Sequence, residues 1–127
     1  NMLKAIVESD GRFQFTASIF DEDRGKRYII SACCENMHTP ITNSKCTLAL
    51  VECSVGDMQY FYSTVAVIDL VNAKLLTTMY LGQGQKDIVF APDDYSFYWG
   101  DCRYEISKDE KTSHTMSVSV NIIISDH

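Results

Sequence analysis

The sequence predicts an all-β protein, an antiparallel β-sandwich or open barrel of about 8–10 strands with at most one short helix. The clearest evidence is residues 115–126, where Met116, Val118, Val120, Ile122 and Ile124 share one parity and polar side chains occupy most of the other. The same period of two recurs in residues 13–19 and 95–99. Each of these segments is therefore expected to be a strand with one buried face.

Strands are expected wherever β-branched and aromatic residues lie between turn signals. The turn signals include Asp10-Gly11, which favours a two-residue hairpin, and Gly100-Asp101. Residues 36–45 contain Pro40 and many polar side chains, so we expect an irregular loop there. The short helix, if present, is expected in that loop or near Pro92. In chain order, the expected strands span residues 3–8, 12–20, 26–35, 46–55, 58–70, 74–81, 87–90, 95–99, 102–107 and 115–125.

Length and composition predict one globular domain over residues 1–127. Apolar residues make up 46% of the chain and charged residues 22%, and the apolar runs are too short to span a bilayer. Asn1 before Met2 has the order expected of a tag remnant, and no secretory signal follows. We therefore expect a cytoplasmic protein that does not enter a membrane.

The residues that could carry catalysis or bind a cofactor form no recognised motif. The five cysteines lack Cys-x-x-Cys spacing, and most lie in apolar runs, so buried and reduced thiols are expected. Metal-binding and nucleotide-binding signatures are absent from the sequence. We expect a protein without enzymatic activity, cofactor or metal. One alternative stays open, in which Cys33 or Cys34 pairs with His38 as a cysteine nucleophile and its base.

Charge is the most informative functional feature of this chain. The net charge of −6 disfavours direct binding to nucleic acid. The acidic excess lies in the carboxyl-terminal half, beside an aromatic cluster at 95–104. If Tyr95, Phe97 and Trp99 face the core, Tyr98 and Tyr104 face outward among carboxylates, an arrangement suited to a basic protein partner. The candidate partner-binding residues are Asp93, Asp94, Tyr98, Asp101 and Glu105, with Asp21, Glu22 and Asp23 as a second patch.

A small acidic β protein with these features resembles, in general character, the bacterial immunity proteins that neutralise a cognate toxin, including those of contact-dependent growth inhibition. The resemblance implies a non-enzymatic inhibitor that binds and blocks a basic toxin, such as a nuclease domain. Its acidic side chains would take the place of nucleic-acid phosphates.

A different class of function also fits the acidic loops. Residues 21–23 and 93–94 could converge at one end of a β-sandwich and bind Ca²⁺, a lipid headgroup or a carbohydrate, with Trp99 contributing.

Overall fold

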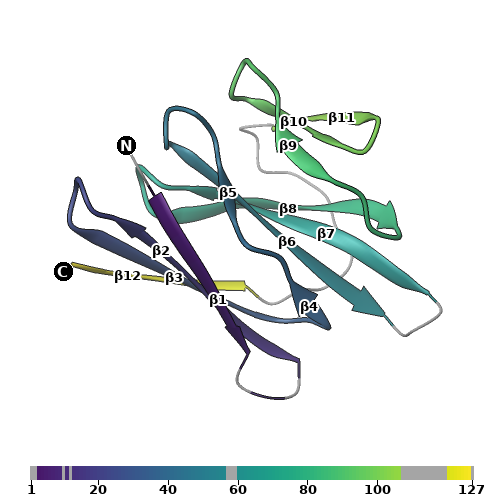
Figure 1. Ribbon diagram of the computed structural model, residues 1–127, viewed down its shortest axis with the longest axis horizontal. Coiled ribbons are helices and arrows are strands. Elements are labelled where there is room, and N and C mark those ends of the chain that lie inside the picture. Colours follow the sequence, from purple (N-terminus) through teal and green to yellow (C-terminus); the bar gives the residue numbers. More distant parts are fainter. Residues whose placement is uncertain (1–2, 10, 12, 57–59, 107–119, 127) are drawn as a thin grey trace.

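A computed structural model describes residues 3–9, 11, 13–56, 60–106 and 120–126 (Figure 1). These residues form strands and turns in three antiparallel sheets, and no helix occurs among them. The same ranges therefore hold no helix with the length and apolar character of a membrane span. The strands are β1 (Leu3–Ser9), β2 (Gln14–Asp21), β3 (Lys26–Cys33), β4 (Asn36–Met37), β5 (Ile41–Thr42), β6 (Leu48–Gly56), β7 (Phe61–Asp69), β8 (Lys74–Gln83), β9 (Ile88–Phe90), β10 (Ser96–Trp99), β11 (Cys102–Glu105) and β12 (Val120–Asp126).

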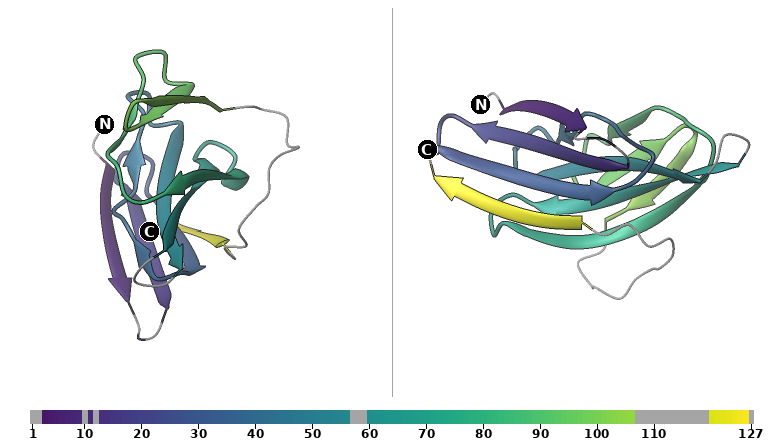
Figure 2. Two further views of the ribbon diagram at one scale, coloured as in Figure 1. Left: turned by 90° about the vertical axis from the view of Figure 1, so that its right-hand side faces the viewer. Right: turned by 90° about the horizontal axis from the view of Figure 1, so that it is seen from below.

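The first sheet has the order β1-β2-β3-β12. β2 and β3 pair along their whole length, from Gln14 opposite Cys33 to Asp21 opposite Lys26. The carboxyl-terminal strand β12 completes the sheet beside β3, as the yellow ribbon in Figure 2 shows. On β2 and β3, one face of the sheet is apolar and buried, which is the pattern that alternation predicts for strands whose other face is exposed to solvent. Its buried side chains are Ala17, Ile19, Tyr28, Ile30 and Ala32.

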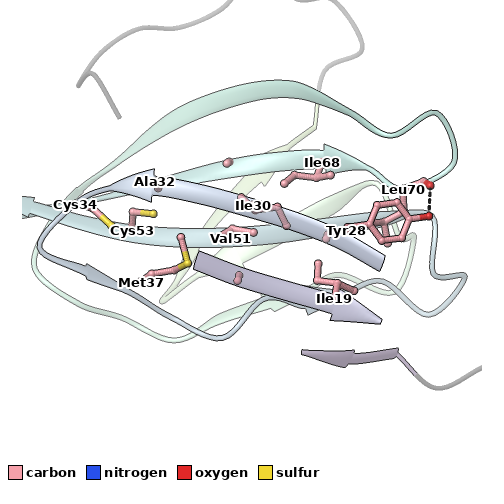
Figure 3. Close-up of a cluster of buried hydrophobic side chains, with 13 residues drawn as sticks. Ile19, Tyr28, Ile30, Ala32, Cys34, Met37, Val51, Cys53, Ile68 and Leu70 are labelled. Carbon is pink, nitrogen blue, oxygen red and sulfur yellow. Dashed lines mark hydrogen bonds between the residues drawn. The ribbon is translucent and has the colours of Figure 1, made fainter. Parts of the chain in front are cut away.

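The second sheet lies in the middle of the molecule, and its strands β6 and β7 are buried on both faces. Its order is β4-β6-β7-β8, and β5 also pairs with β6. Successive residues of a strand point to opposite faces. Val51 packs toward the first sheet, whereas its neighbour Leu50 packs toward the third. Figure 3 shows the core between the first and second sheets, where the Tyr28 hydroxyl donates a 2.7 Å hydrogen bond to the Leu70 carbonyl.

The third sheet, β11-β10-β9, covers the opposite face of the second sheet (green in Figure 1). Phe97 and Trp99 of β10 point inward and are 0% and 3% exposed. Tyr104 of β11 stands opposite Phe97, and the two rings stack with centroids 5.2 Å apart. The outer face of β10 and its neighbours is therefore the surface that this layer presents to solvent.

The predicted antiparallel β-sandwich is confirmed, with sheets that do not close into a barrel. Each expected strand is present with ends shifted by a few residues, although residues 12, 58–59, 107 and 115–119 of these strands lie outside the described part of the chain. The expected loop at 36–45 holds two additional two-residue strands, β4 and β5, which pair with β6. The third layer was not predicted. It arises because β6 and β7 have apolar residues on both of their faces, and each apolar face must be covered by another sheet.

Candidate functional site

Asp93 lies in the turn between β9 and β10 and organises that turn. Its carboxylate accepts hydrogen bonds from the backbone N–H groups of Tyr95 at 2.9 Å and Ser96 at 3.0 Å. Arg103 of β11 donates to the second carboxylate oxygen at 3.0 Å and also contacts Glu105 at 3.3 Å. The hydrogen bond from Tyr95, followed by those from Ser96 and the charge of Arg103, lowers the pKa of Asp93. Asp93 and Glu105 are both exposed, and they share one guanidinium.

Asp94 is buried and holds two loops together. Only 5% of the residue is exposed, and its backbone φ is 64°. The hydroxyl of Ser44 donates to its carboxylate at 2.6 Å, and the backbone N–H of Ser44 donates at 3.2 Å. The side chain of Asn43 also reaches the Asp94 carbonyl. Asp94 therefore anchors the 43–47 loop, and its carboxylate is buried rather than exposed on the surface, unlike the prediction that it is an exposed binding residue.

The outer surface of the third sheet brings together most of the first predicted patch. Val89, Tyr98 and Arg103 stand side by side across β9, β10 and β11. Val89 is 53% exposed and Tyr98 is half-buried. Asp101 is exposed in the β10–β11 turn, at the end of the sheet away from the Ser96–Glu105 pair. We call this surface the β9–β11 face, and its residues are Val89, Asp93, Tyr98, Asp101, Arg103 and Glu105.

The expectation for the neighbouring aromatic residues was partly wrong. Phe97 and Trp99 face the core as expected, but Tyr95 precedes the strand and is 52% exposed. Tyr104 points inward because it stacks on Phe97, and its hydroxyl donates to the Leu81 carbonyl at 3.0 Å. Tyr98 is thus the aromatic side chain that β10 presents on its outer face.

The second predicted patch, at the β2–β3 turn, is largely neutralised by neighbouring cations. Asp21 is 4% exposed and lies 3.5 Å from the Arg24 guanidinium. Glu22 forms an ion pair with Lys4 at 3.1 Å, and Asp23 is exposed. In the described ranges, no three His, Cys, Asp or Glu side chains gather closely enough to hold a metal ion. The acidic loops thus do not assemble the predicted Ca²⁺ ligands there.

A cleft that was not predicted lies where the third sheet ends, and we call it the Glu52 cleft. It has a volume of about 640 Å³ and is lined by His38, Glu52, Lys86 and Asp87, among others. Glu52 lies in β6, is only 4% exposed and accepts a 3.2 Å hydrogen bond from the indole N–H of Trp99. Lys86 extends over the Trp99 ring, with its ammonium 4.8 Å from the ring centroid.

One signal in the sequence could have indicated this cleft. Glu52 is the single charged residue in the apolar run 48–55, which forms a central strand. A carboxylate at such a position is buried by the fold, and burial of a charge is costly without a partner. What could not be read from the sequence is that Trp99, far along the chain, supplies the hydrogen bond.

Cys34 and His38 lie on different faces of the second sheet. Cys34 belongs to the core between the first and second sheets, where its side chain lies beside that of Cys53 (Figure 3). Contact with Cys53 lowers the pKa of Cys34, while the same contact and burial raise the pKa of Cys53. His38 lines the Glu52 cleft instead. Cys33 is exposed and accepts a hydrogen bond from Gln14. The structure does not bring a cysteine and His38 together as the alternative requires.

Comparison with protein families, with curated proteins and with solved structures finds no match to this chain.

Proposed function

We propose that this protein is a non-enzymatic inhibitor that binds a basic partner protein through the β9–β11 face. The partner class that we infer is a toxin with a cationic active groove, such as a nuclease domain, and the protein would act as its immunity protein in the bacterial cytoplasm. The observation that carries the proposal is the composition of this face. It presents three exposed carboxylates, Asp93, Asp101 and Glu105, against one guanidinium, around the half-buried ring of Tyr98.

The face has the chemistry of a protein interface. Tyrosine offers a large, rigid contact area at low entropic cost, and Val89 extends that area across the sheet. The carboxylates surround this centre, as charged groups do at the rim of an interface. The surrounding charge would steer a cationic partner toward the face and orient it there.

The structure beneath the face favours binding without rearrangement. Phe97 and Trp99 anchor β10 in the core, so Tyr98 between them has a fixed backbone. Arg103 bridges Asp93 and Glu105 and thereby holds two of the three carboxylates in place. Preorganisation of this kind reduces the entropy lost on association. Because a nuclease groove attracts phosphates, carboxylates held at fixed positions would occupy it and exclude nucleic acid.

The test purifies this protein together with the products of the genes adjacent to its own. We expect one of those products to be a basic toxin that forms a one-to-one complex with this protein and loses its activity stoichiometrically. The double variant Asp101→Lys/Glu105→Lys should associate about 10-fold or more slowly than the parent at low salt, because it replaces attraction by repulsion. The difference should shrink as salt screens the exposed charges. Glu22→Lys is the matched control, since it reverses an exposed charge on another sheet and should leave association within about 2-fold of the parent.

Two results would overturn the proposal. One is a complex whose association rate is the same for the parent and the double variant at low salt. The other is toxin activity that persists in the presence of excess protein.

A further inference from the structure

Glu52 is a buried carboxylate that has no counter-ion within ion-pair distance among the described residues. Its side chain shares its parity with Leu50 and faces the third sheet, where Trp99 donates one hydrogen bond to Oε2. Among the described residues, no Lys, Arg or His nitrogen lies within the 4.0 Å ion-pair distance of this carboxylate. An ionised carboxylate can accept about four hydrogen bonds, so most of its capacity is unused. Such a group is normally paired or bound to a ligand.

Lys86 supplies the opposite charge on the same cleft without neutralising Glu52. Its ammonium lies over the Trp99 ring, while the nitrogen at the edge of that ring contacts Glu52. The indole of Trp99 thus contacts both the Glu52 carboxylate and the Lys86 ammonium and separates the two charges. In the described part of the chain, Lys86 itself has no carboxylate within ion-pair distance.

One further polar atom of the Glu52 cleft is buried and lacks a partner in the described chain. It is Nε2 of His38, which lines the cleft. Buried polar atoms are almost always hydrogen-bonded, and an orphaned atom at a cleft is explained by a ligand or an ordered water. The cleft volume of about 640 Å³ is in the range of small-molecule sites.

We propose that the Glu52 cleft binds a small organic zwitterion of the α-amino-acid class. The ammonium group of the ligand donates to Glu52, which restores the missing counter-ion, and the carboxylate of the ligand pairs with Lys86. Asp87 adds a second negative charge to the lining of the cleft, and Ile88 and Val89 provide an apolar wall for the ligand side chain. A simple amine would leave Lys86 unpaired, and a simple acid would leave Glu52 unpaired.

This site does not depend on the proposed protein partner. The cleft shares Val89 with the β9–β11 face, but the two charged groups that would bind the ligand, Glu52 and Lys86, lie outside that face. The cleft could therefore bind a ligand in a protein that has no toxin partner. The two proposals are therefore tested by separate measurements.

Trp99 makes the test direct, because it is the only tryptophan in the chain and contacts both Glu52 and Lys86. The full chain is titrated with each proteinogenic amino acid in turn, followed by Trp99 fluorescence and by calorimetry. For the tightest ligand, the amine lacking its carboxylate and the acid lacking its amine are then compared. We expect one or more amino acids to bind saturably, and each half-ligand to bind about 10-fold or more weakly. Failure of every amino acid to bind overturns the inference, as does an amine that binds as tightly as its parent.

Two variants of the cleft residues test whether the amino acid binds in the Glu52 cleft. Glu52→Gln keeps an oxygen that can accept from the indole, and Lys86→Met removes only an exposed ammonium, so the second variant is expected to fold even if the first does not. Each should weaken amino-acid binding about 10-fold or more by calorimetry. Lys74→Met, an exposed lysine of β8, is the control and should bind as the parent does. Unchanged binding by Lys86→Met would contradict the assignment.

Discussion

Strands β6 and β7 of the second sheet are buried on both faces. Truncation of a core side chain on either face should therefore lower the free energy of unfolding by a similar amount. Leu50 of β6 is 2% exposed and packs against the third sheet, whereas Ile68 of β7 is 0% exposed and packs against the first sheet. Truncation to alanine removes three carbons from each side chain, worth about 2.4 kcal/mol in transfer free energy. The cavities left behind add to this, so Leu50→Ala and Ile68→Ala should each lower the free energy of unfolding by about 2–5 kcal/mol.

The assay is equilibrium unfolding in urea, followed by Trp99 fluorescence and far-ultraviolet circular dichroism. With a slope of about 1–3 kcal/mol per molar urea, each substitution should lower the unfolding midpoint by roughly 0.7–5 M. Val71→Ala, at a residue that is 54% exposed in the β7–β8 turn, is the control and should change stability by less than about 0.5 kcal/mol. In a sandwich of only two layers, one face of this sheet would be exposed to solvent. A cost below about 0.5 kcal/mol for either Leu50→Ala or Ile68→Ala would therefore refute the three-layer packing.

Three further predictions concern single groups. Tyr28→Phe should lower the free energy of unfolding by about 1–3 kcal/mol, because it leaves a buried carbonyl without its donor, and a cost near zero would show that water replaces the hydroxyl. The folded-state pKa of Asp93 is lowered, chiefly by the Tyr95 N–H, so its contribution to stability is present above about pH 4 and is lost as the pH falls through the folded-state pKa. The difference in melting temperature between the parent and Asp93→Asn should accordingly shrink at acid pH, and a constant difference would argue against it. A thiol reagent should label Cys33 and Cys102 in the folded protein and the remaining cysteines only after unfolding, which a count of labelled thiols will check.

The strands could be predicted because most of their information is local. Alternation in residues 13–19 placed Ala17 and Ile19 on the buried face of β2. The two short strands β4 and β5 were missed because two residues are too few to show a period, and their pairing with β6 is set by the fold.

The third layer was encoded in the sequence, but not by alternation. Strand β6 reads as an almost continuous apolar run from Leu48 to Val55, and such runs are typical of strands covered on both faces. The predicted strand at 58–70 has the same character. Two such strands side by side require a sheet on each side, which the pattern of residues 88–106 then supplies.

The candidate site was only partly predictable, since the role of a carboxylate depends on distant residues. Asp93 and Asp94 are adjacent in sequence, yet one is exposed and the other is buried against Ser44, fifty residues away. Asp21 is likewise buried by its own turn and by Arg24. Sequence alone identified the segment that is rich in acidic and aromatic residues, but only the fold separates carboxylates that face solvent from those that hold loops together.

Amide hydrogen exchange tests most directly whether the β9–β11 face binds a basic protein. Exchange is measured for the protein alone and in complex with the basic partner protein that co-purifies with it. The account predicts that slowing on complex formation is concentrated in residues 88–105, including the amide of Tyr98. Slowing confined to the first sheet, with residues 88–105 unchanged, would contradict it.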